Sequence, residues 1–299
     1  MKFWRQLFLL LVFVFGGFVV CLVFSMALVL ALGGDVQSPL VLHLLQWSQV
    51  VLMMSVPALL WGRYVMRTSP YSQPTAFRVN NWPRMAEGMS LGWPGWRALG
   101  LGLCLMLVAT PWLDGVSVFF RTLPYPASLQ AHFETESVVY NATILKLLSV
   151  GGIGGLVESF LLMCLGAAVS EELVFRGALF SVFRYETLWN VHVVALLLGL
   201  IFSLIHFDLY GLVPRWLMGT MFVYLTYYTG SIWPGVAAHT LNNTMALLQY
   251  RTVSPDELDR LGTDYTFGWP LVLVSVVATV LLGYVLVKNN TIFAKNRAK

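Results

Sequence analysis

The stretch LLMCLGAAVSEELVFRGALFSVF, residues 161–183, sets three charged side chains inside an otherwise apolar run. A charged side chain inside a bilayer costs about 2.5–3.5 kcal/mol, so such residues persist where they pair, face water or perform chemistry. On a helix, Glu172 and Arg176 are four residues apart and share one face, within reach of an ion pair. Glu171 is rotated by about 100° from Glu172 and has no such cation. We interpret the pair as a packing clamp and Glu171 as a functional carboxylate.

The rest of the chain predicts an all-α, polytopic membrane helical bundle. Of the 299 residues, 58% are hydrophobic and 11% are charged, whereas soluble domains carry about 25% charged residues. Several apolar runs reach the roughly 20 residues that a helix needs to cross a bilayer. We expect one integral membrane domain over residues 1–299. About eight transmembrane helices are predicted, at residues 7–32, 39–61, 98–120, 152–180, 191–209, 214–230, 232–250 and 268–288.

Basic residues predict the orientation of this bundle. Segment 62–97 carries five arginines against one glutamate, and lysines and arginines also occur near both chain ends. With eight spans these regions share one face, which the positive-inside rule makes cytoplasmic. We therefore expect a multi-pass protein of a bacterial inner membrane with both termini cytoplasmic. The net charge of +4 is explained by these loops and does not indicate nucleic-acid binding.

Two further polar motifs lie on later spans. GLIFSLIHF carries Phe202 and His206 four residues apart, and GVAAHTLNNTM carries His239 and Asn243 at the same spacing. A lone histidine in a helical bundle is usually an interhelical hydrogen-bonding group. Three polar motifs in series, each on its own span, favour a shared site instead. Asn242 is rotated by about 100° from Asn243 and is left out of this site.

These side chains are compatible with two chemistries. Glu171 and one histidine can polarise a water, while the other imidazole and the Asn243 amide donate to a developing oxyanion. Alternatively, Glu171, His206 and His239 can hold a divalent metal such as zinc through oxygen and nitrogen atoms. The spacing leaves both open. Either requires a tilt or shifted boundaries that bring Glu171 and His206 to the same depth. Glu158 and His43 are interpreted as structural.

In their order, EExxxR, FxxxH and HxxxN resemble the CPBP family, the CAAX-prenyl-endopeptidase and bacteriocin-processing intramembrane proteases, also called the Abi family. The resemblance covers residues 171–243. It implies a catalytic core in residues 152–250 and an intramembrane endopeptidase that acts on a peptide or protein substrate at the lipid bilayer. It also implies that Glu171 and His206 activate water and that His239 and Asn243 stabilise the oxyanion. Glu172, Arg176 and Phe202 take supporting positions.

The resemblance is compatible with a glutamate-type or a metal-dependent enzyme. No cofactor is firmly implied, and a divalent metal such as zinc is compatible with the motifs. We favour the metal-free glutamate mechanism, because no third histidine or further carboxylate near the motifs completes a metal shell. The alternative function is a non-catalytic membrane immunity or scaffold protein that reuses the fold. A proton-coupled transporter would show internal repeats and broken helices in matching halves, and neither is evident. The sequence also lacks HExxH, GxSG and GxGD, which typify other intramembrane proteases.

One segment outside the predicted spans is compatible with an amphipathic helix. It is PYPASLQAHFETESVVYNATILKLL, residues 124–148, which mixes acidic and polar residues with apolar ones. Its acidic part lies on the face opposite the basic loops in the predicted topology. The sequence does not indicate its function.

Overall fold

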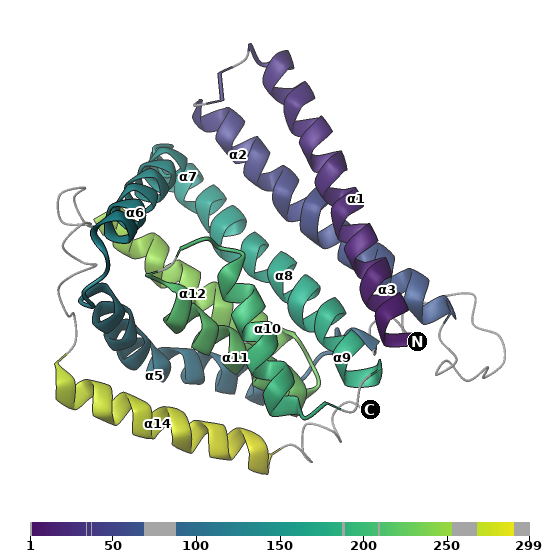
Figure 1. Ribbon diagram of the computed structural model, residues 1–299, viewed down its shortest axis with the longest axis vertical. Coiled ribbons are helices and arrows are strands. Elements are labelled where there is room, and N and C mark those ends of the chain that lie inside the picture. The colour runs from purple at the N-terminus through teal and green to yellow at the C-terminus, as the bar shows by residue number, and fades with distance from the viewer. Residues whose placement is uncertain are drawn as a thin grey trace.

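The regular structure is entirely helical wherever the chain is described. The computed structural model describes residues 2–33, 35–36, 38–68, 88–186, 189–208, 210–252 and 268–289. Every element in these ranges is a helix, which confirms the predicted all-α fold (Figure 1). Arg78, Arg84, Lys295, Arg297 and Lys299, on which the predicted orientation partly depends, lie outside these ranges. The orientation therefore stays a prediction.

Five helical runs in the described ranges are long and apolar enough to cross a membrane, and they make the chain an integral membrane protein. They correspond to the first four and the last of the predicted spans. The runs are Phe3–Ala31, Pro39–Val65, Trp96–Arg121, Gly152–Arg184 and Trp269–Lys288.

Two of these runs contain π-helical turns, which widen a helix locally and often occur at functional sites. The second run consists of α2 (Pro39–Ser48), η1 (Gln49–Ser55) and α3 (Val56–Thr68). The fourth consists of α7 (Gly152–Ser159), η2 (Phe160–Gly166), α8 (Ala167–Glu172), η3 (Leu173–Leu179) and α9 (Phe180–Glu186). The remaining runs are α1 (Lys2–Ala31), α5 (Trp96–Arg121) and α14 (Trp269–Lys288).

Three other helices lie where the fifth, sixth and seventh spans are predicted. They are shorter or more polar than the five long runs, so five of the eight predicted segments meet the length and composition of a span. In Figure 1 these helices occupy the centre of the molecule, with α5 between α12 and α14. The three are α10 (Val191–Leu204), α11 (Leu212–Thr229) and α12 (Trp233–Thr252).

The predicted amphipathic segment forms α6 (Ala127–Leu147), which lies across one end of the bundle (Figure 1). Within α6 only Phe133 and Leu147 are buried. The helix therefore covers the bundle rather than belonging to its core. His43 on α2 holds its C-terminal end, because its Nε2 atom lies 2.7 Å from the Leu147 carbonyl oxygen. The Nδ1 atom of His43 lies 2.8 Å from Glu158 of α7, which gives both residues the structural role predicted for them.

Small residues let the central helices approach closely. A Cβ atom added to Gly102 of α5 would lie 2.5 Å from the carbonyl oxygen of Pro234 at the start of α12. A Cβ atom on Gly199 of α10 would collide with Thr220 of α11. Backbones in membrane bundles meet at such small residues, because apolar side chains gain little from contacting one another instead of lipid.

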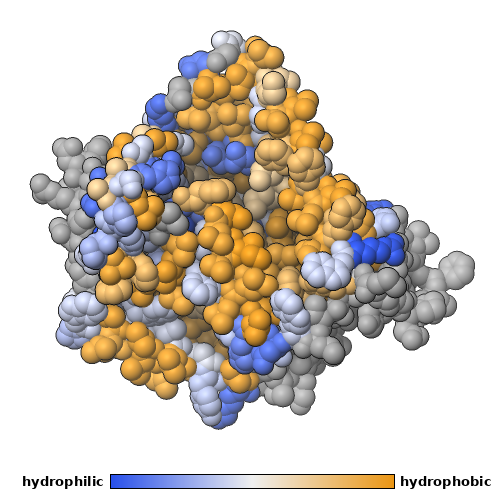
Figure 2. Space-filling model, viewed as in Figure 1, coloured by the Kyte–Doolittle hydropathy of each residue, from blue (hydrophilic) through white to orange (hydrophobic). Residues whose placement is uncertain are grey.

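The outer surface matches a lipid environment. Figure 2 shows hydrophobic side chains along the outward faces of α1 and α14. Phe15 and Val23 on α1, and Leu273 and Val280 on α14, are among the exposed large apolar residues. In water such a surface would be an aggregation hazard, whereas lipid tails solvate it.

Candidate active site

Glu172 and Arg176 form the predicted ion pair at the centre of the bundle. Arg176 Nη1 donates to Glu172 Oε1 over 2.9 Å, and neither side chain is exposed to solvent. Arg176 Nη2 also donates to the carbonyl oxygen of Gly219 on α11, over 2.8 Å. A Cβ atom at position 219 would lie 3.3 Å from this nitrogen, so a glycine there gives the guanidinium room. The pair thus ties the fourth helical run to α11.

Aromatic rings enclose the guanidinium. The central carbon of Arg176 lies 4.6 Å from the ring centroid of Phe202 and 5.3 Å from that of Phe222. A cation over an aromatic face is attracted by the ring quadrupole, more strongly where water is excluded. Phe202 also packs edge-on against His206, with the ring centroids 4.9 Å apart. The FxxxH phenylalanine therefore connects the buried cation with the histidine of the same motif.

His239 of α12 is held by the second glutamate of the first motif. Its Nδ1 atom lies 3.2 Å from Glu172 Oε1, and because an ionised carboxylate only accepts, the nitrogen donates. The ring stacks on Phe222 with an interplanar angle of 28°. Its Nε2 atom is thereby directed at Glu171, 3.7 Å from Oε2.

His206 lies in the turn that follows α10. Its Nδ1 atom donates to the carbonyl oxygen of Phe202 over 2.7 Å, since a carbonyl can only accept. This leaves Nε2 facing Glu171, 3.9 Å from Oε2. The next residue, Phe207, has a left-handed backbone with φ of 52°, so the chain turns sharply here and ends the helix.

Glu171 therefore lies between two imidazoles that come from different helices. The predicted spans place Glu171 and His206 at different depths in the membrane. In the structure the two side chains lie at the same level, because α8 and the end of α10 come together there. Oε2 of Glu171 is buried and has no hydrogen-bond partner among the described residues, although both Nε2 atoms lie within 4 Å. A carboxylate oxygen in this position can accept a proton from a water or a substrate group placed between it and an imidazole.

Asn243 lies one turn after His239 on α12. Its Nδ2 atom donates to the carbonyl oxygen of Met163 on η2 over 3.2 Å, which leaves its second N–H available. Its Oδ1 atom accepts from Asn242 over 3.3 Å. Asn242 itself lines the same cavity. The helical geometry predicts that Asn242 points away from this site, but its side chain is long enough to reach back toward Asn243.

All four predicted site residues line one cavity of about 400 Å³, referred to below as the Glu171 cavity. Glu171 enters it from α8, His206 from the end of α10, and His239 and Asn243 from α12. Apolar side chains also line this cavity. Among them are Val50, Ile144, Leu148, Leu162 and Leu247.

The segment that contributes these residues has a recognisable family pattern. Residues 154–245 match the family model described as Rce1-like, type II CAAX prenyl endopeptidase Rce1-like. This segment is similar to an Rce1-like endopeptidase domain. No curated protein and no solved structure matches the chain. The matched segment contains Glu171, His206, His239 and Asn243, and it lies within the segment 152–250 in which the catalytic core is predicted.

The Glu171 oxygen lies slightly farther from the two imidazoles than the ligand atoms of a tetrahedral zinc lie from one another. Zinc bonds of about 2.0–2.2 Å in a tetrahedral site place two ligand atoms about 3.4 Å apart. The two imidazole nitrogens lie 3.7 and 3.9 Å from the Glu171 oxygen. Within the described residues, no three histidine, cysteine or acidic side chains come together closely enough to hold a metal ion. We therefore assign no step to a metal.

Two cavity residues outside the motifs are not evident from the sequence. Tyr140 comes from α6 and Arg215 from α11, and both line the Glu171 cavity together with the predicted site residues. Arg215 forms an ion pair with Asp208, with Nη2 and Oδ2 2.9 Å apart. Neither residue lies at a motif spacing, so only the packing of α6 and α11 over the site reveals them.

Proposed function

We propose that this protein is an intramembrane endopeptidase of the CAAX-protease type, which hydrolyses a peptide bond with a water activated by Glu171 and His206. The observation that carries the proposal is the position of the Glu171 carboxylate between the Nε2 atoms of His206 and His239, at 3.9 and 3.7 Å. The match of residues 154–245 to a CAAX prenyl endopeptidase family supports the same conclusion.

In this mechanism Glu171 is the general base. A water hydrogen-bonded to Glu171 and to His206 Nε2 loses a proton to the carboxylate as its oxygen attacks the scissile carbonyl carbon. The C–N bond of the tetrahedral intermediate then breaks, and the proton passes from Glu171 to the leaving nitrogen. The products are a carboxylate on the N-terminal fragment and an amine on the C-terminal fragment.

His239 and Asn243 stabilise the oxyanion that forms in the same step. His239 donates through Nδ1 to Glu172, which directs the Nε2 side of the ring into the Glu171 cavity, where a doubly protonated ring donates through Nε2 as well. Asn243 offers the N–H that its bond to Met163 leaves available. Donors aimed at developing charge in a dry site are usually the largest single source of rate enhancement.

The test is hydrolysis of a prenylated peptide with a C-terminal CAAX sequence by the purified full-length protein in detergent, followed by mass spectrometry of the fragments. Glu171→Gln keeps the shape of the side chain but removes the base, so kcat is expected to fall by at least about 100-fold. The kcat of His206→Ala is expected to fall by a comparable factor. Full activity in both variants would overturn the proposal.

Glu158→Gln is the matched control. Glu158 is a second glutamate of the same helical run, paired with His43 and outside the Glu171 cavity. Its substitution should leave kcat within about threefold of wild type, because the side chain touches none of the proposed reacting groups. A comparable loss in Glu158→Gln and Glu171→Gln would show that any lost intramembrane carboxylate disturbs the fold.

A further inference from the structure

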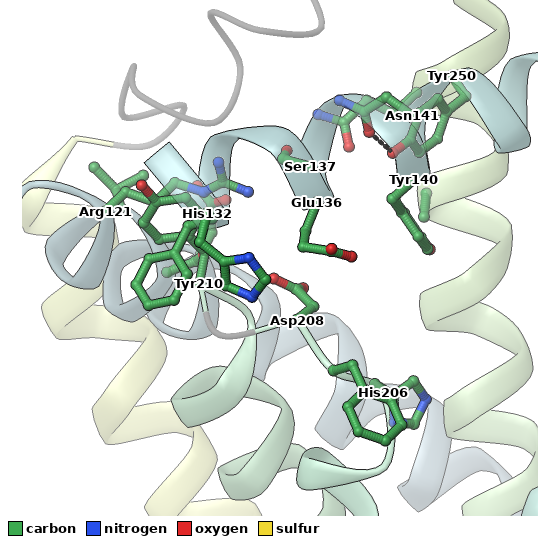
Figure 3. A pocket seen from close by; sticks show the side chains of 17 residues that line it. Arg121, His132, Glu136, Ser137, Tyr140, Asn141, His206, Asp208, Tyr210 and Tyr250 are labelled. Atoms are coloured by element: carbon green, nitrogen blue, oxygen red, sulfur yellow. Dashed lines mark hydrogen bonds between the residues drawn. The ribbon is translucent and has the colours of Figure 1, made fainter. Parts of the chain in front are cut away.

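A second cavity of about 380 Å³, referred to below as the Arg121 cavity, adjoins the Glu171 cavity beneath α6. Figure 3 shows His206 at one end of this space and Arg121 with Tyr210 at the other. A substrate whose reacting bond lies at His206 therefore has room to extend into it. The two cavities adjoin, since they share four lining residues, Tyr140, His206, Ala246 and Tyr250.

The two cavities differ in chemistry. Beyond its reacting groups the Glu171 cavity is walled mainly by aliphatic side chains from η1, α6, η2 and α12. The Arg121 cavity is lined largely by charged and polar groups. Among these are Asp114, Arg121, His132, Glu136, Asn141 and Asp208. A peptide that crosses the junction at His206 would thus place apolar groups on one side of the reacting bond and polar groups on the other.

Arg121, the last residue of α5, is fixed in position at the far end of this cavity. Its guanidinium carbon lies 4.8 Å from the ring centroid of Tyr210. That ring packs edge-on against Phe133 of α6, at 5.1 Å, and against Tyr125, at 6.1 Å. Among the described residues, Arg121 has no ion-pair partner. The cation is held by an aromatic cluster, with its hydrogen-bond donors free for a ligand.

One acidic residue of this cavity, Asp208, is already paired with another cation. Asp208 accepts from Arg215 over 2.9 Å and from the backbone N–H of Gly211 over 3.1 Å. Glu136 of α6 also lines the cavity, and in Figure 3 it lies with Asp208 between Arg121 and His206. Two of the acidic groups of the cavity, Glu136 and Asp208, therefore lie between Arg121 and the junction at His206.

We propose that the Arg121 cavity receives the C-terminal side of the substrate and that Arg121 binds a peptide carboxylate there; this inference rests on the endopeptidase function proposed above. Hydrolysis at the junction would leave the new amine, an ammonium at neutral pH, beside Glu136 and Asp208. The carboxylate of the same fragment would lie at Arg121. Guanidinium groups bind carboxylates through two parallel hydrogen bonds, which gives both affinity and orientation.

The carboxylate bound at Arg121 has two candidate sources, the C-terminus of the peptide and an acidic side chain, and binding experiments distinguish them. Three short peptides of identical apolar sequence serve as probes: one with a free C-terminal carboxylate, one with a C-terminal amide, and one with a C-terminal amide on a final glutamate. Binding of each is measured on full-length Glu171→Gln protein in detergent, so that the result does not depend on turnover. We expect the free acid to bind about tenfold more tightly than the plain amide, the effect of one well-placed charged contact.

Variants of Arg121 test whether this residue causes the preference for the free acid. In the Glu171→Gln background, Arg121→Gln should bind acid and amide equally, and Arg121→Lys should restore part of the preference because it keeps the charge. Arg97→Gln is the matched control, since Arg97 is an exposed arginine at the other end of α5 and lines neither cavity. Thermal unfolding of each variant checks that the fold is retained.

Each outcome bears on one proposal. The carboxylate site is overturned if protein that keeps Arg121 binds the acid and amide peptides equally. It is also overturned if the preference for the free acid survives in Arg121→Gln. A preference shown only by the peptide ending in glutamate assigns the site to an acidic side chain instead of the C-terminus. If the preference depends on Arg121 but the wild-type protein cleaves none of the peptides and no prenylated CAAX peptide, the endopeptidase function fails and the binding site stands.

Discussion

His239 Nδ1 donates to Glu172 Oε1, the same oxygen that accepts from Arg176. The carboxylate interpreted from the sequence as a packing clamp therefore also orients an imidazole of the candidate active site. This contact joins α12 to the fourth helical run at the position where His239 faces Glu171. Both glutamates of the EExxxR motif thus act on one histidine, Glu172 through Nδ1 and Glu171 through Nε2.

Glu172→Gln should distinguish the role of Glu172 in orienting His239 from its role as the ion-pair partner of Arg176. The amide keeps the size of the side chain, but it can turn its NH2 group toward His239 Nδ1, so the contact no longer fixes the direction of the ring. We expect kcat for the CAAX peptide to fall by at least about 100-fold, as when an orienting carboxylate is replaced by an amide in a hydrolytic triad. Unchanged kcat would contradict the orienting role.

Breaking the buried ion pair should destabilise the protein. Arg176→Met leaves Glu172 as a charge that is fully buried and has lost its cation, so we expect the free energy of unfolding to fall by about 3–5 kcal/mol. Glu172→Leu should cost a similar amount, because Arg176 is then left unpaired. The double variant should recover much of the loss, as a hydrophobic pair needs no charge compensation. Unfolding by denaturant in detergent measures all three, and additive losses would contradict this account.

Gly219→Ala tests the close approach at the ion pair. The added Cβ atom would lie 3.0 Å from Phe202 Cδ1 and 3.3 Å from Arg176 Nη2, so we expect a loss of about 1–3 kcal/mol in unfolding free energy. Gly100→Ala is the control, since a Cβ atom at this α5 position meets nothing within 4 Å. It should be neutral or stabilising by up to about 1 kcal/mol. Equal losses at both positions would contradict the packing argument.

The Asp208–Arg215 contact should give stability that depends on acid pH. Burial alone would raise the pKa of Asp208, but Arg215, the Gly211 N–H and, more weakly, Arg121 together lower this pKa below its ordinary value. A lowered pKa means that the carboxylate stabilises the fold above pH of about 4 and that this contribution is lost as the pH falls further. The difference in unfolding temperature between wild type and Asp208→Asn should therefore be constant from pH 7 to about 4 and shrink below. A difference already lost near pH 6 would contradict the assignment.

Metal removal should leave activity unchanged. The Glu171 oxygen lies too far from both imidazoles for a tetrahedral zinc as the side chains stand. We therefore expect the purified protein to hydrolyse the CAAX peptide equally well after dialysis against EDTA, and elemental analysis to find less than stoichiometric zinc. Loss of activity on chelation, with recovery on adding zinc, would require the side chains to close around a metal.

The orientation in the membrane can be tested with single cysteines. After the three native cysteines are replaced, Thr135→Cys on the exposed face of α6 should react with an impermeant maleimide in intact cells. A cysteine appended to the C-terminus should react only after the membrane is permeabilised. The reverse pattern would place the termini outside.

Hydropathy and local spacing were sufficient for part of this structure. The apolar runs of α1, α5 and α14 predict spanning helices, because crossing a bilayer needs only length and composition. The ion pair of Glu172 with Arg176 follows from residues four apart on one helix, and so does the shared face of His239 and Asn243. These relationships lie within single helices, where geometry is set by the chain itself.

The relationships between helices depended on tertiary packing. Nothing local brings Glu171 level with His206, directs His239 toward both glutamates, or places α6 over a second cavity that ends at Arg121. Such contacts depend on how closely α10, α11 and α12 approach one another. The distance between these helices is set where glycines such as Gly199 and Gly219 meet neighbouring side chains. Sequence thus determined which side chains carry charge within the membrane. Only the packed structure determined which of them meet, since distances between helices are set by the sum of many contacts far apart in the chain.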